Sequence, residues 1–200
     1  MIVRKIGILG GTFDPPHIGH LLIAQEVLEQ CKLDEIWFMP ANIPPHKKTN
    51  DVSSVDDRIE MVTKAIDGAD QFVVSTIELE RTGPSYTVDT LKELKMKLPD
   101  VDFYFIIGGD MIEQLHTWER IDELFEYVTF VGLGRPGYSE TSTYEEKMVL
   151  LTIPQVDISS SSIRDRIKEG RSIRYFVPES VRHFIEEREL YGTNASVRNR

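Results

Sequence analysis

The segment from Gly10 to His20 combines two glycines, two histidines and a helix start in one short stretch, Gly-Gly-Thr-Phe-Asp-Pro-Pro-His-Ile-Gly-His. Gly10 and Gly11 let backbone N–H groups turn toward a ligand, and Thr12 follows them directly. His17 and His20 are three residues apart, so they lie on one face of the first helical turn. Their imidazoles can donate hydrogen bonds to phosphate oxygens and, when protonated, also supply positive charge. Together with the helix N-terminus, this pattern predicts an anion-binding site.

The two histidines have other interpretations besides a phosphate site. Either ring could simply cap or pack the start of the helix. A zinc site needs at least one more ligand, but His46, His116 and His183 are scattered and Cys31 falls in a predicted helix. We therefore predict no metal-ligating residues in the chain. The segment is neither a Gly-Lys-Ser/Thr phosphate loop nor a Gly-x-Gly-x-x-Gly dinucleotide loop.

A second cluster of polar residues lies near the C-terminus, in Ile-Ser-Ser-Ser-Ser-Ile-Arg from Ile158 to Arg164. Serines at a helix start cap it, which by itself would explain them. Ser160 and Ser161 could also hold phosphate oxygens through their hydroxyl and N–H groups. Arg164, one turn into the helix, offers a planar fork of donors to the same anion.

Three segments between these clusters carry residues suited to a second substrate. Lys47, in Pro-Pro-His-Lys-Lys, could bind a phosphate as a point charge or be a solvated loop lysine. Tyr86 and Thr87 begin a predicted helix, capped by Ser85, whose first N–H groups suit a carboxylate. Gly109 and Asp110 end a predicted strand, and Asp110 could hold ribose hydroxyls or help position a metal.

An aromatic side chain follows in the sequence Thr-Trp-Glu, which we place in a short helix. The indole of Trp118 could stack on a flat heteroaromatic ring, or it could pack in the core. Glu119 comes next, and its carboxylate would repel an acidic substrate if the side chain pointed inward. We expect this side chain to point outward.

Predicted strands and helices alternate along the chain and place these residues at their junctions. Apolar runs bounded by turn residues predict strands, and apolar positions at helical spacing predict helices. The strands are 3–9, 36–39, 72–75, 101–107, 128–131 and 150–153, the helices are 18–31, 55–66, 86–98, 159–169 and 179–188, and 132–146 is a loop with a polar stretch. This order predicts an α/β fold, a Rossmann-like, doubly wound and mostly parallel sheet with helices on both faces and a small C-terminal helical part.

Ligands of such sheets bind beyond the carboxyl ends of the strands, at the switch point. We therefore expect the loops after residues 9 and 107 and the region around Arg135 to converge on one rim. We predict one domain over residues 1–192, with 193–200 as a frayed tail.

Composition excludes several classes of protein. A net charge of −10 argues against a nucleic-acid partner, which needs a basic face. No stretch approaches the roughly 20 apolar residues of a membrane span, so no membrane partner is expected. A single cysteine excludes an intrachain disulfide, and no signal-peptide pattern precedes the first glycines, so we expect a cytoplasmic protein.

The two clusters resemble the paired signatures of the nucleotidyltransferase superfamily with the His/Thr-x-Gly-His motif. Its second signature, Ile-Ser-Ser-Thr-x-Ile-Arg, has Ser161 here in place of Thr, which keeps a hydroxyl. The resemblance implies that His17, His20 and Arg164 are catalytic and contact the phosphates of ATP. The glycines, Thr12 and the serines would complete that site, and Arg135 would close on the polyphosphate.

The middle segments resemble one branch, the bacterial nicotinate mononucleotide adenylyltransferases, over almost the whole chain. The resemblance implies that Trp118 stacks on the pyridine, that backbone N–H groups near Thr87 and Glu119 hold the nicotinate carboxylate, and that Lys47 positions the acceptor phosphate. Many relatives have an aromatic residue where this chain has Glu119. ATP and nicotinate mononucleotide are the implied substrates, in NAD biosynthesis, with Mg²⁺ held mainly by substrate phosphates.

Several rival functions stay open at this point. Nicotinamide mononucleotide or phosphopantetheine could be the acceptor, although phosphopantetheine has no flat ring for the tryptophan. A dehydrogenase should show a Gly-x-Gly-x-x-Gly loop, which is missing, and a non-catalytic nucleotide sensor would tolerate loss of either signature. The oligomeric state is open, a homo-oligomer included.

Overall fold

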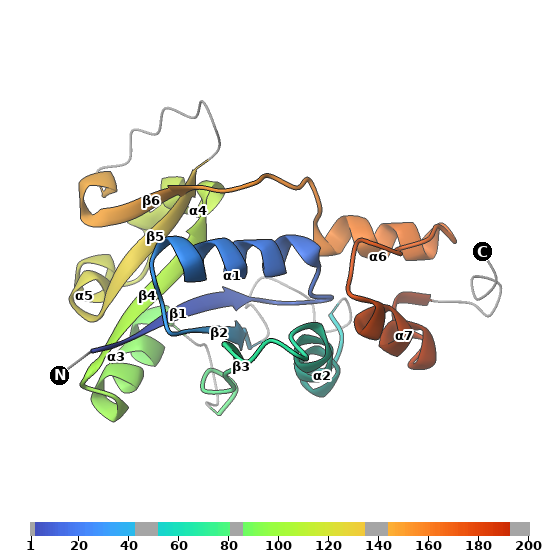
Figure 1. The fold of residues 1–200 in the computed structure, drawn as a ribbon, viewed down its shortest axis with the longest axis horizontal. Coiled ribbons are helices and arrows are strands. Elements are labelled where there is room, and N and C mark those ends of the chain that lie inside the picture. The colour runs from blue at the N-terminus through green and yellow to red at the C-terminus, as the bar shows by residue number, and fades with distance from the viewer. Residues whose placement is uncertain (1–2, 43–51, 81–85, 135–143, 193–200) are drawn as a thin grey trace.

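A single parallel sheet organises the chain in the computed structural model, which describes residues 3–42, 52–80, 86–134 and 144–192. In this described part the strands are β1 (Arg4–Gly11), β2 (Glu35–Pro40), β3 (Phe72–Val74), β4 (Val101–Gly108), β5 (Val128–Gly134) and β6 (Met148–Thr152). They pair in the order β3-β2-β1-β4-β5-β6, and every pairing is parallel (Figure 1). The doubly wound α/β fold expected from the sequence is confirmed.

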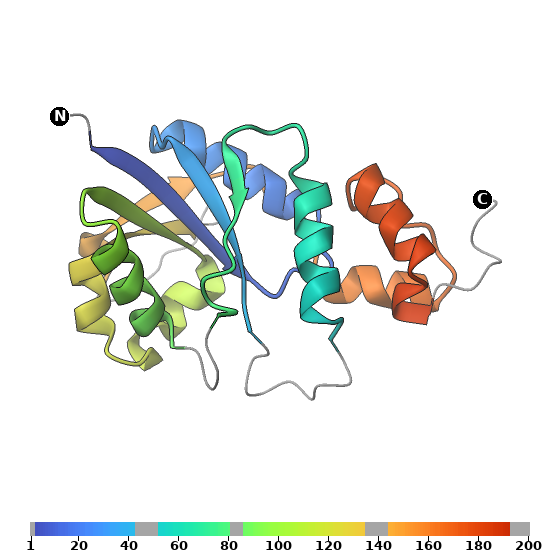
Figure 2. The same cartoon turned by 90° about the horizontal axis from the view of Figure 1, so that it is seen from below.

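Helices cover both faces of the sheet, as Figures 1 and 2 show. On one face lie α1 (Ile18–Gln30) and α2 (Val55–Ala65), and on the other lie α3 (Thr87–Lys97), α4 (Gly109–Gln114) and α5 (Ile121–Tyr127). Beyond the carboxyl end of β1, α6 (Ser160–Lys168) and α7 (Glu179–Glu187) form the small C-terminal helical part beside α2. Three short 3₁₀ turns complete the described elements: η2 (Leu115–Thr117), η3 (Glu145–Lys147) and η4 (Leu190–Gly192).

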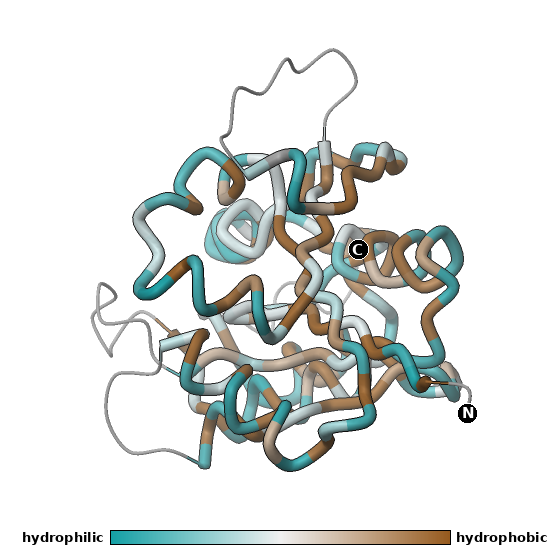
Figure 3. Tube along the Cα trace, turned by 90° about the vertical axis from the view of Figure 1, so that its left-hand side faces the viewer, coloured by the Kyte–Doolittle hydropathy of each residue, from teal (hydrophilic) through white to brown (hydrophobic). Residues whose placement is uncertain are grey.

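The strands are buried on both faces, which explains their nearly continuous apolar sequences. In β1, Ile6 and Ile8 face a core shared with α3, α4 and α5, whereas Leu9 faces a core shared with α1, α2, α6 and α7. Burying a side chain of this size stabilises the fold by about 1.5–3 kcal/mol. Figure 3 shows the hydrophobic stretches running through the middle of the molecule.

The strand order creates a switch point between β1 and β4. The chain leaves β1 toward β2 through α1 on one face, and leaves β4 toward β5 through α4 and α5 on the other face. The loops after these two strands therefore diverge to opposite faces at the carboxyl ends of the strands, which is where ligands of such sheets bind. Gly11 ends β1 and Gly108 ends β4, so both glycine-rich segments predicted to bind ligand lie at this switch point.

Most predicted elements agree with the structure to within two residues, and three predictions need correction. Gly132–Gly134 continues β5, because these residues pair with β6, and does not belong to a loop. The helices α4 and α5 were not predicted. Trp118 follows η2 in extended conformation and does not lie inside a helix. Among the described residues, no helix is long and apolar enough to cross a membrane.

Candidate active site

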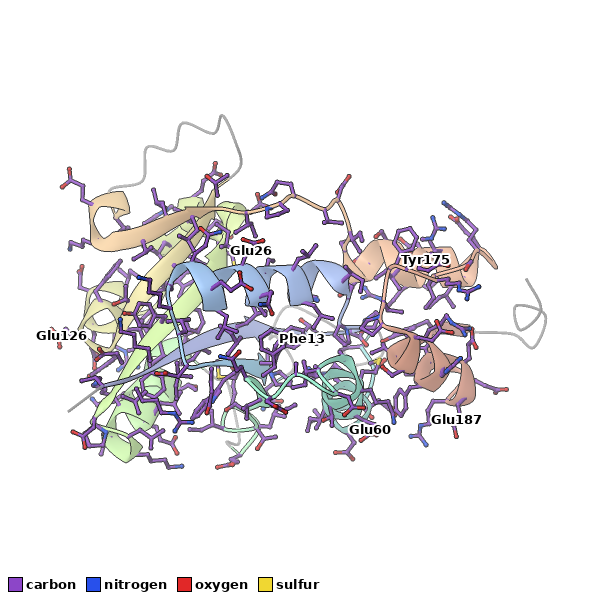
Figure 4. All side chains as sticks on the ribbon, viewed as in Figure 1. Phe13, Glu26, Glu60, Glu126, Tyr175 and Glu187 are labelled. Atoms are coloured by element: carbon purple, nitrogen blue, oxygen red, sulfur yellow. The ribbon has the colours of Figure 1, made fainter. Side chains whose placement is uncertain are left out.

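The loop between β1 and α1 is anchored by the buried ring of Phe13. This residue has a left-handed backbone, with a φ of 51°, although it is not glycine. Such a conformation costs on the order of 1–3 kcal/mol and persists only where the surroundings impose it. Here the ring is 1% exposed, lies between α1 and α2 in Figure 4, and packs edge-on against the ring of His20 with centroids 5.0 Å apart. The anchored ring thus fixes the loop and one histidine together.

The two histidines of the first cluster form one stacked pair at the start of α1. His17 is the N-cap and His20 is the third helical residue. Their ring centroids lie 3.7 Å apart, with the planes inclined by 27°. The backbone N–H of His17 donates to Nδ1 of His20 at 3.1 Å. Because Nδ1 accepts, the neutral His20 ring carries its proton on Nε2, where it can be donated to a ligand.

The histidine pair is neutral at pH 7. Burial lowers the pKa of His17 from 6.5 to about 4. The pKa of His20 is lowered to about 3, mainly by burial and further by His17. The positive charge that the sequence allowed on protonation is therefore absent near neutrality. At neutral pH the pair can therefore offer hydrogen-bond donors to an anion, but no positive charge.

Gly19 sits between the two histidines because the ring of His17 occupies the space of a side chain. A Cβ atom placed on Gly19 would lie 3.0 Å from Nδ1 and 3.1 Å from Cε1 of His17. Contacts this short would force the ring to shift by a few tenths of an ångström. The ring is 7% exposed and stacked on its partner, so it has little room to retreat. The spacing His-x-Gly-His is thus a packing requirement.

The start of α6 is fastened to the loop after β1. Ser159 caps this helix, its hydroxyl accepting from the N–H of Ser162 at 3.1 Å. The hydroxyl of Ser160 donates to the carbonyl of Pro15 at 2.8 Å, across 145 positions of sequence. Arg164 donates from Nη1 to the carbonyl of Asp14 at 2.8 Å and from Nη2 to the hydroxyl of Ser161 at 3.3 Å. The two sequence clusters therefore form one site, with the N-termini of α1 and α6 at the same loop.

This geometry changes how the serine cluster is interpreted. Capping, which the sequence offered as a full explanation, is performed by Ser159 and Ser162. The hydroxyl proton of Ser160 is already donated within the protein, so Ser160 can only accept further bonds. Ser161 is exposed and lies beside Arg164. Contact of these residues with ATP stays a prediction.

A buried carboxylate, Asp14, lies under the loop and was not singled out from the sequence. It is 2% exposed and accepts from the hydroxyl of Tyr191 at 2.7 Å and from the N–H of Ser53 at 3.3 Å. Nη1 of Arg164 lies 3.9 Å from its Oδ2. Burial, and then the charge of Asp14, raise the pKa of Tyr191 well above its ordinary value. The C-terminal turn η4 is thereby tied to the loop after β1.

Sequence analysis also missed Arg58, which donates to the carbonyl of Thr12 at 2.9 Å. A signal for it was present, because Arg58 falls on the apolar face of its helix with Val55 and Val62, where a charge must find partners. No comparable signal marks Tyr191, whose partner is 177 positions away.

Two of the segments proposed to hold the acceptor, those of Thr87 and Trp118, come together on the α3 and α4 face of the sheet. Tyr86 is the N-cap of α3 and Thr87 its first residue. Arg120 forms an ion pair with Asp89. Arg120 comes two residues after Trp118, and Asp89 comes two residues after Thr87. Arg120 itself has a left-handed φ of 52°. This pair links the segment of Thr87 to the segment of Trp118, which the sequence placed in one substrate site.

The indole of Trp118 is half-buried, and its orientation is fixed by aromatic neighbours. It packs edge-on against Phe105 and Phe130, with centroids 5.9 and 6.2 Å away. The backbone N–H of Trp118 is already used, because it donates to the carbonyl of Leu115 at 3.0 Å. The next N–H along the chain belongs to Glu119. The side chain of Glu119 is exposed, as expected. Core packing is therefore one role of the tryptophan, and stacking on a ligand ring stays a prediction.

The sequence predicted that Gly109 and Asp110 end a strand, but they form the first turn of α4, because β4 ends at Gly108. Asp110 is exposed, and its contact with a ribose stays a prediction. Lys47, Arg135 and the predicted cap Ser85 lie outside the described residues. Within the described residues, no group of three or more His, Cys, Asp or Glu side chains could hold a metal ion.

Comparisons with known proteins place the chain in a family. A model of the cytidylyltransferase-like family matches residues 8–166. A protein of Geobacillus thermodenitrificans named "Probable nicotinate-nucleotide adenylyltransferase" is 54% identical, over 96% of this chain and 88% of the relative. A protein of the same name from Halalkalibacterium halodurans is 52% identical, over 97% of this chain and 94% of the relative.

The chain belongs to the nicotinate-nucleotide adenylyltransferase family. It is therefore an enzyme of the nucleotidyltransferase class. Among solved structures, a Plasmodium falciparum nicotinic acid mononucleotide adenylyltransferase complexed with NaAD superposes with a TM-score of 0.81, over 96% of this chain and 98% of that chain. The sequence identity is 23%, so this likeness concerns the fold alone, and it confirms the Rossmann-like fold of this chain.

Proposed function

We propose that the protein transfers the adenylyl group of ATP to nicotinate mononucleotide, giving nicotinate adenine dinucleotide and pyrophosphate in NAD biosynthesis. The observation that carries the proposal is the fastening of α6 to the loop after β1, which brings the histidine pair, Arg164 and two helix N-termini to one place beside the switch point. Such a set of donors suits a polyphosphate. The family relatives carry names with the same activity.

The reaction is an in-line displacement at the α-phosphorus of ATP. An oxygen of the acceptor 5′-phosphate forms the new P–O bond, and the bond to the bridging oxygen of pyrophosphate breaks. The attacking phosphate is already anionic at pH 7, so no general base is needed. The enzyme has to align two anions and stabilise the charge that develops on the leaving group.

The residues of the site divide this work by their chemistry. His20 would donate to the anion from Nε2, because its Nδ1 accepts from the backbone N–H of His17. The N–H groups of Ile18 and His20 already donate to the carbonyls of Phe176 and His17, so the imidazole rings are the donors of α1 that we assign to the phosphates. Arg164 supplies a permanent positive charge and holds α6 against Asp14. Gly10, Gly11 and Thr12 would line the phosphates, as would Ser160, Ser161 and, from the sequence, Arg135.

The acceptor would lie on the other side of the switch point from the histidine pair, between α3 and the segment after α4. Trp118 stacks on the pyridine, and the N–H groups of Thr87 and Glu119 receive the carboxylate. A carboxylate accepts from both donors, whereas an amide would place its NH₂ against an N–H and leave it unpaired, at a cost of about 1–3 kcal/mol. Tyr86, Gly109 and Asp110 would border the ribose, and Lys47 would hold the acceptor phosphate.

Mg²⁺ is part of the proposal and would be held by the phosphates of the substrates. The described residues of the phosphate site are N–H and hydroxyl donors, which suit anions, while Mg²⁺ prefers oxygen ligands and retains water. When bound, the ion supplies charge neutralisation on the polyphosphate. A cytoplasmic location, expected from the sequence, also belongs to the proposal.

Product identification tests the proposal directly. The protein is incubated with ATP, Mg²⁺ and nicotinate mononucleotide, and the products are identified by mass spectrometry. We expect nicotinate adenine dinucleotide and pyrophosphate in equal amounts, and their loss in His20→Asn at unchanged folded content. If a parallel incubation with ATP and phosphopantetheine gave an adenylylated product and pyrophosphate while nicotinate mononucleotide gave none, the proposed acceptor would be wrong.

A further inference from the structure

Arg58 on α2 is a fully buried arginine at the base of the site. Its exposed fraction is 0%. Nη1 donates to two backbone carbonyls, that of Thr12 at 2.9 Å and that of Ala41 at 2.8 Å. Thr12 belongs to the loop after β1, and Ala41 is the first residue after β2. One guanidinium nitrogen therefore connects two loops that leave neighbouring strands.

The bridge is placed where the pairing of the two strands ends. Gly11 is in register with Pro40, and the N–H of Ala41 donates to the carbonyl of Gly11 at 2.8 Å. The next carbonyls, of Thr12 and Ala41, are both acceptors and cannot bond to each other. The guanidinium supplies the two protons that join them, and so extends the connection between β1 and β2 by one step.

The arrangement costs stability in other respects. Nε and Nη2 of Arg58 are buried and have no hydrogen-bond partner among the described residues. Burial lowers the pKa of Arg58, an effect opposed by the charge of Asp14 nearby. An arginine remains protonated even so. A buried cation with unpaired donors is weak evidence for a role in stability, because an apolar side chain of similar volume often stabilises a fold more.

We propose that Arg58 is a positioning residue that fixes the loop of the ATP site relative to the end of β2. The inference rests on the proposed function, in which the loop after β1 holds ATP. With both carbonyls held by one nitrogen, the backbone at Thr12 keeps a constant separation from the backbone at Ala41, the first residue after β2. That separation holds the loop of the ATP site in one position relative to the sheet, and so sets the alignment of bound ATP for in-line attack.

A positioning role differs from two simpler roles in its kinetic effects. A residue that only stabilises the fold would change the midpoint of unfolding and leave kcat of the folded enzyme unchanged. A residue that only supplies charge to the ATP site would change the KM for ATP and would be replaced well by lysine. A residue that aligns the loops lowers kcat while each substrate still binds, and lysine replaces it poorly because it lacks the fork.

The test compares Arg58→Lys and Arg58→Met with a matched control, Lys64→Met. Lys64 is on the same helix, and its ammonium pairs with Glu60 at 3.1 Å on the surface, so the control removes the same charge away from the loops. Thermal unfolding followed by circular dichroism establishes that each variant is folded. Pyrophosphate release then gives kcat and the KM values for ATP and nicotinate mononucleotide. Inactivity of the wild type itself would refute the proposed function before any variant is compared.

We expect Arg58→Met to lower kcat on the order of 100-fold, because small misplacements of reacting groups have effects of that size. The KM for ATP and the KM for nicotinate mononucleotide should each change by less than about three-fold, since the groups that contact the two substrates are still present. Arg58→Lys should recover only part of the loss, and Lys64→Met should match the wild type. A folded Arg58→Lys or Arg58→Met enzyme with wild-type kcat would overturn the proposal, as would a rise confined to the KM for ATP. Failure of both variants to fold would assign Arg58 to stability and also overturn it.

Discussion

Replacing Gly19 by alanine should separate stability from activity. The new Cβ atom would lie 3.0 Å from Nδ1 and 3.1 Å from Cε1 of His17. Alanine in place of glycine within a helix stabilises it by up to about 1 kcal/mol. The clash acts in the opposite direction, but its relief requires only a movement of the His17 ring. We therefore expect the free energy of unfolding to change by less than about 1 kcal/mol.

The catalytic effect of the same substitution should be much larger. A ring displaced by a few tenths of an ångström passes its movement to His20, because the two centroids lie only 3.7 Å apart. Misplaced donors lose their alignment with the phosphates, and the expected loss in kcat/KM is on the order of 10- to 100-fold. Pyrophosphate release and urea unfolding, measured on the same preparation, give both quantities.

A double-mutant cycle identifies the cause of that loss. If alanine at position 19 acts through the ring of His17, then adding it to His17→Ala should cause no further decrease in kcat/KM. The single variant Gly19→Ala with activity within two-fold of the wild type would refute the packing argument. An undiminished effect of alanine in the His17→Ala background would show that it acts on the backbone of α1.

Three further outcomes follow from the described contacts. Tyr191→Phe removes the hydrogen bond to Asp14 and should lower the free energy of unfolding by about 2 kcal/mol in urea titrations; a change below about 0.5 kcal/mol would contradict that assignment. Because the pKa values of His17 and His20 are lowered to about 4 and about 3, the unfolded chain binds more protons between about pH 6.5 and pH 4, so stability falls on acidification. Each histidine should contribute about 2 kcal/mol to the fall in the free energy of unfolding between pH 7 and pH 5. In the variant with both histidines replaced by asparagine, the free energy of unfolding should depend less on pH than in the wild type. The same pH dependence in both proteins would contradict this prediction. Trp118→Ala should raise the KM for the pyridine mononucleotide about ten-fold at an unchanged KM for ATP, and an equal rise in both would argue against stacking.

The alternation of apolar runs was sufficient to predict the sheet and its major helices. The helices α4 and α5 were missed because they are short, so that buried positions such as Ile112 and Leu124 give no periodic pattern of useful length. Gly132 and Gly134 suggested a loop, yet pairing with β6 keeps these residues in β5. In both cases tertiary contacts override the local pattern.

The clusters at the two helix starts were predictable where their residues are neighbours in sequence. Spacing placed His17 with His20 on one helical turn and Ser160 with Arg164 at the start of another helix, as the structure has them. The contact of Asp14 with Tyr191 could not, because it exists only once η4 folds back onto the loop. The charge state of the histidines was equally hidden, since it depends on burial that no local pattern reveals.

The comparison of two acceptors tests the central claim most directly. Values of kcat/KM are measured by pyrophosphate release with ATP and Mg²⁺, using nicotinate mononucleotide and nicotinamide mononucleotide under identical conditions. The account predicts that the acid is favoured by roughly 5- to 150-fold, because the amide leaves one of the two backbone donors unpaired, at a cost of about 1–3 kcal/mol. Equal values for the two acceptors would contradict carboxylate recognition by Thr87 and Glu119, and no release with either would contradict the proposed reaction.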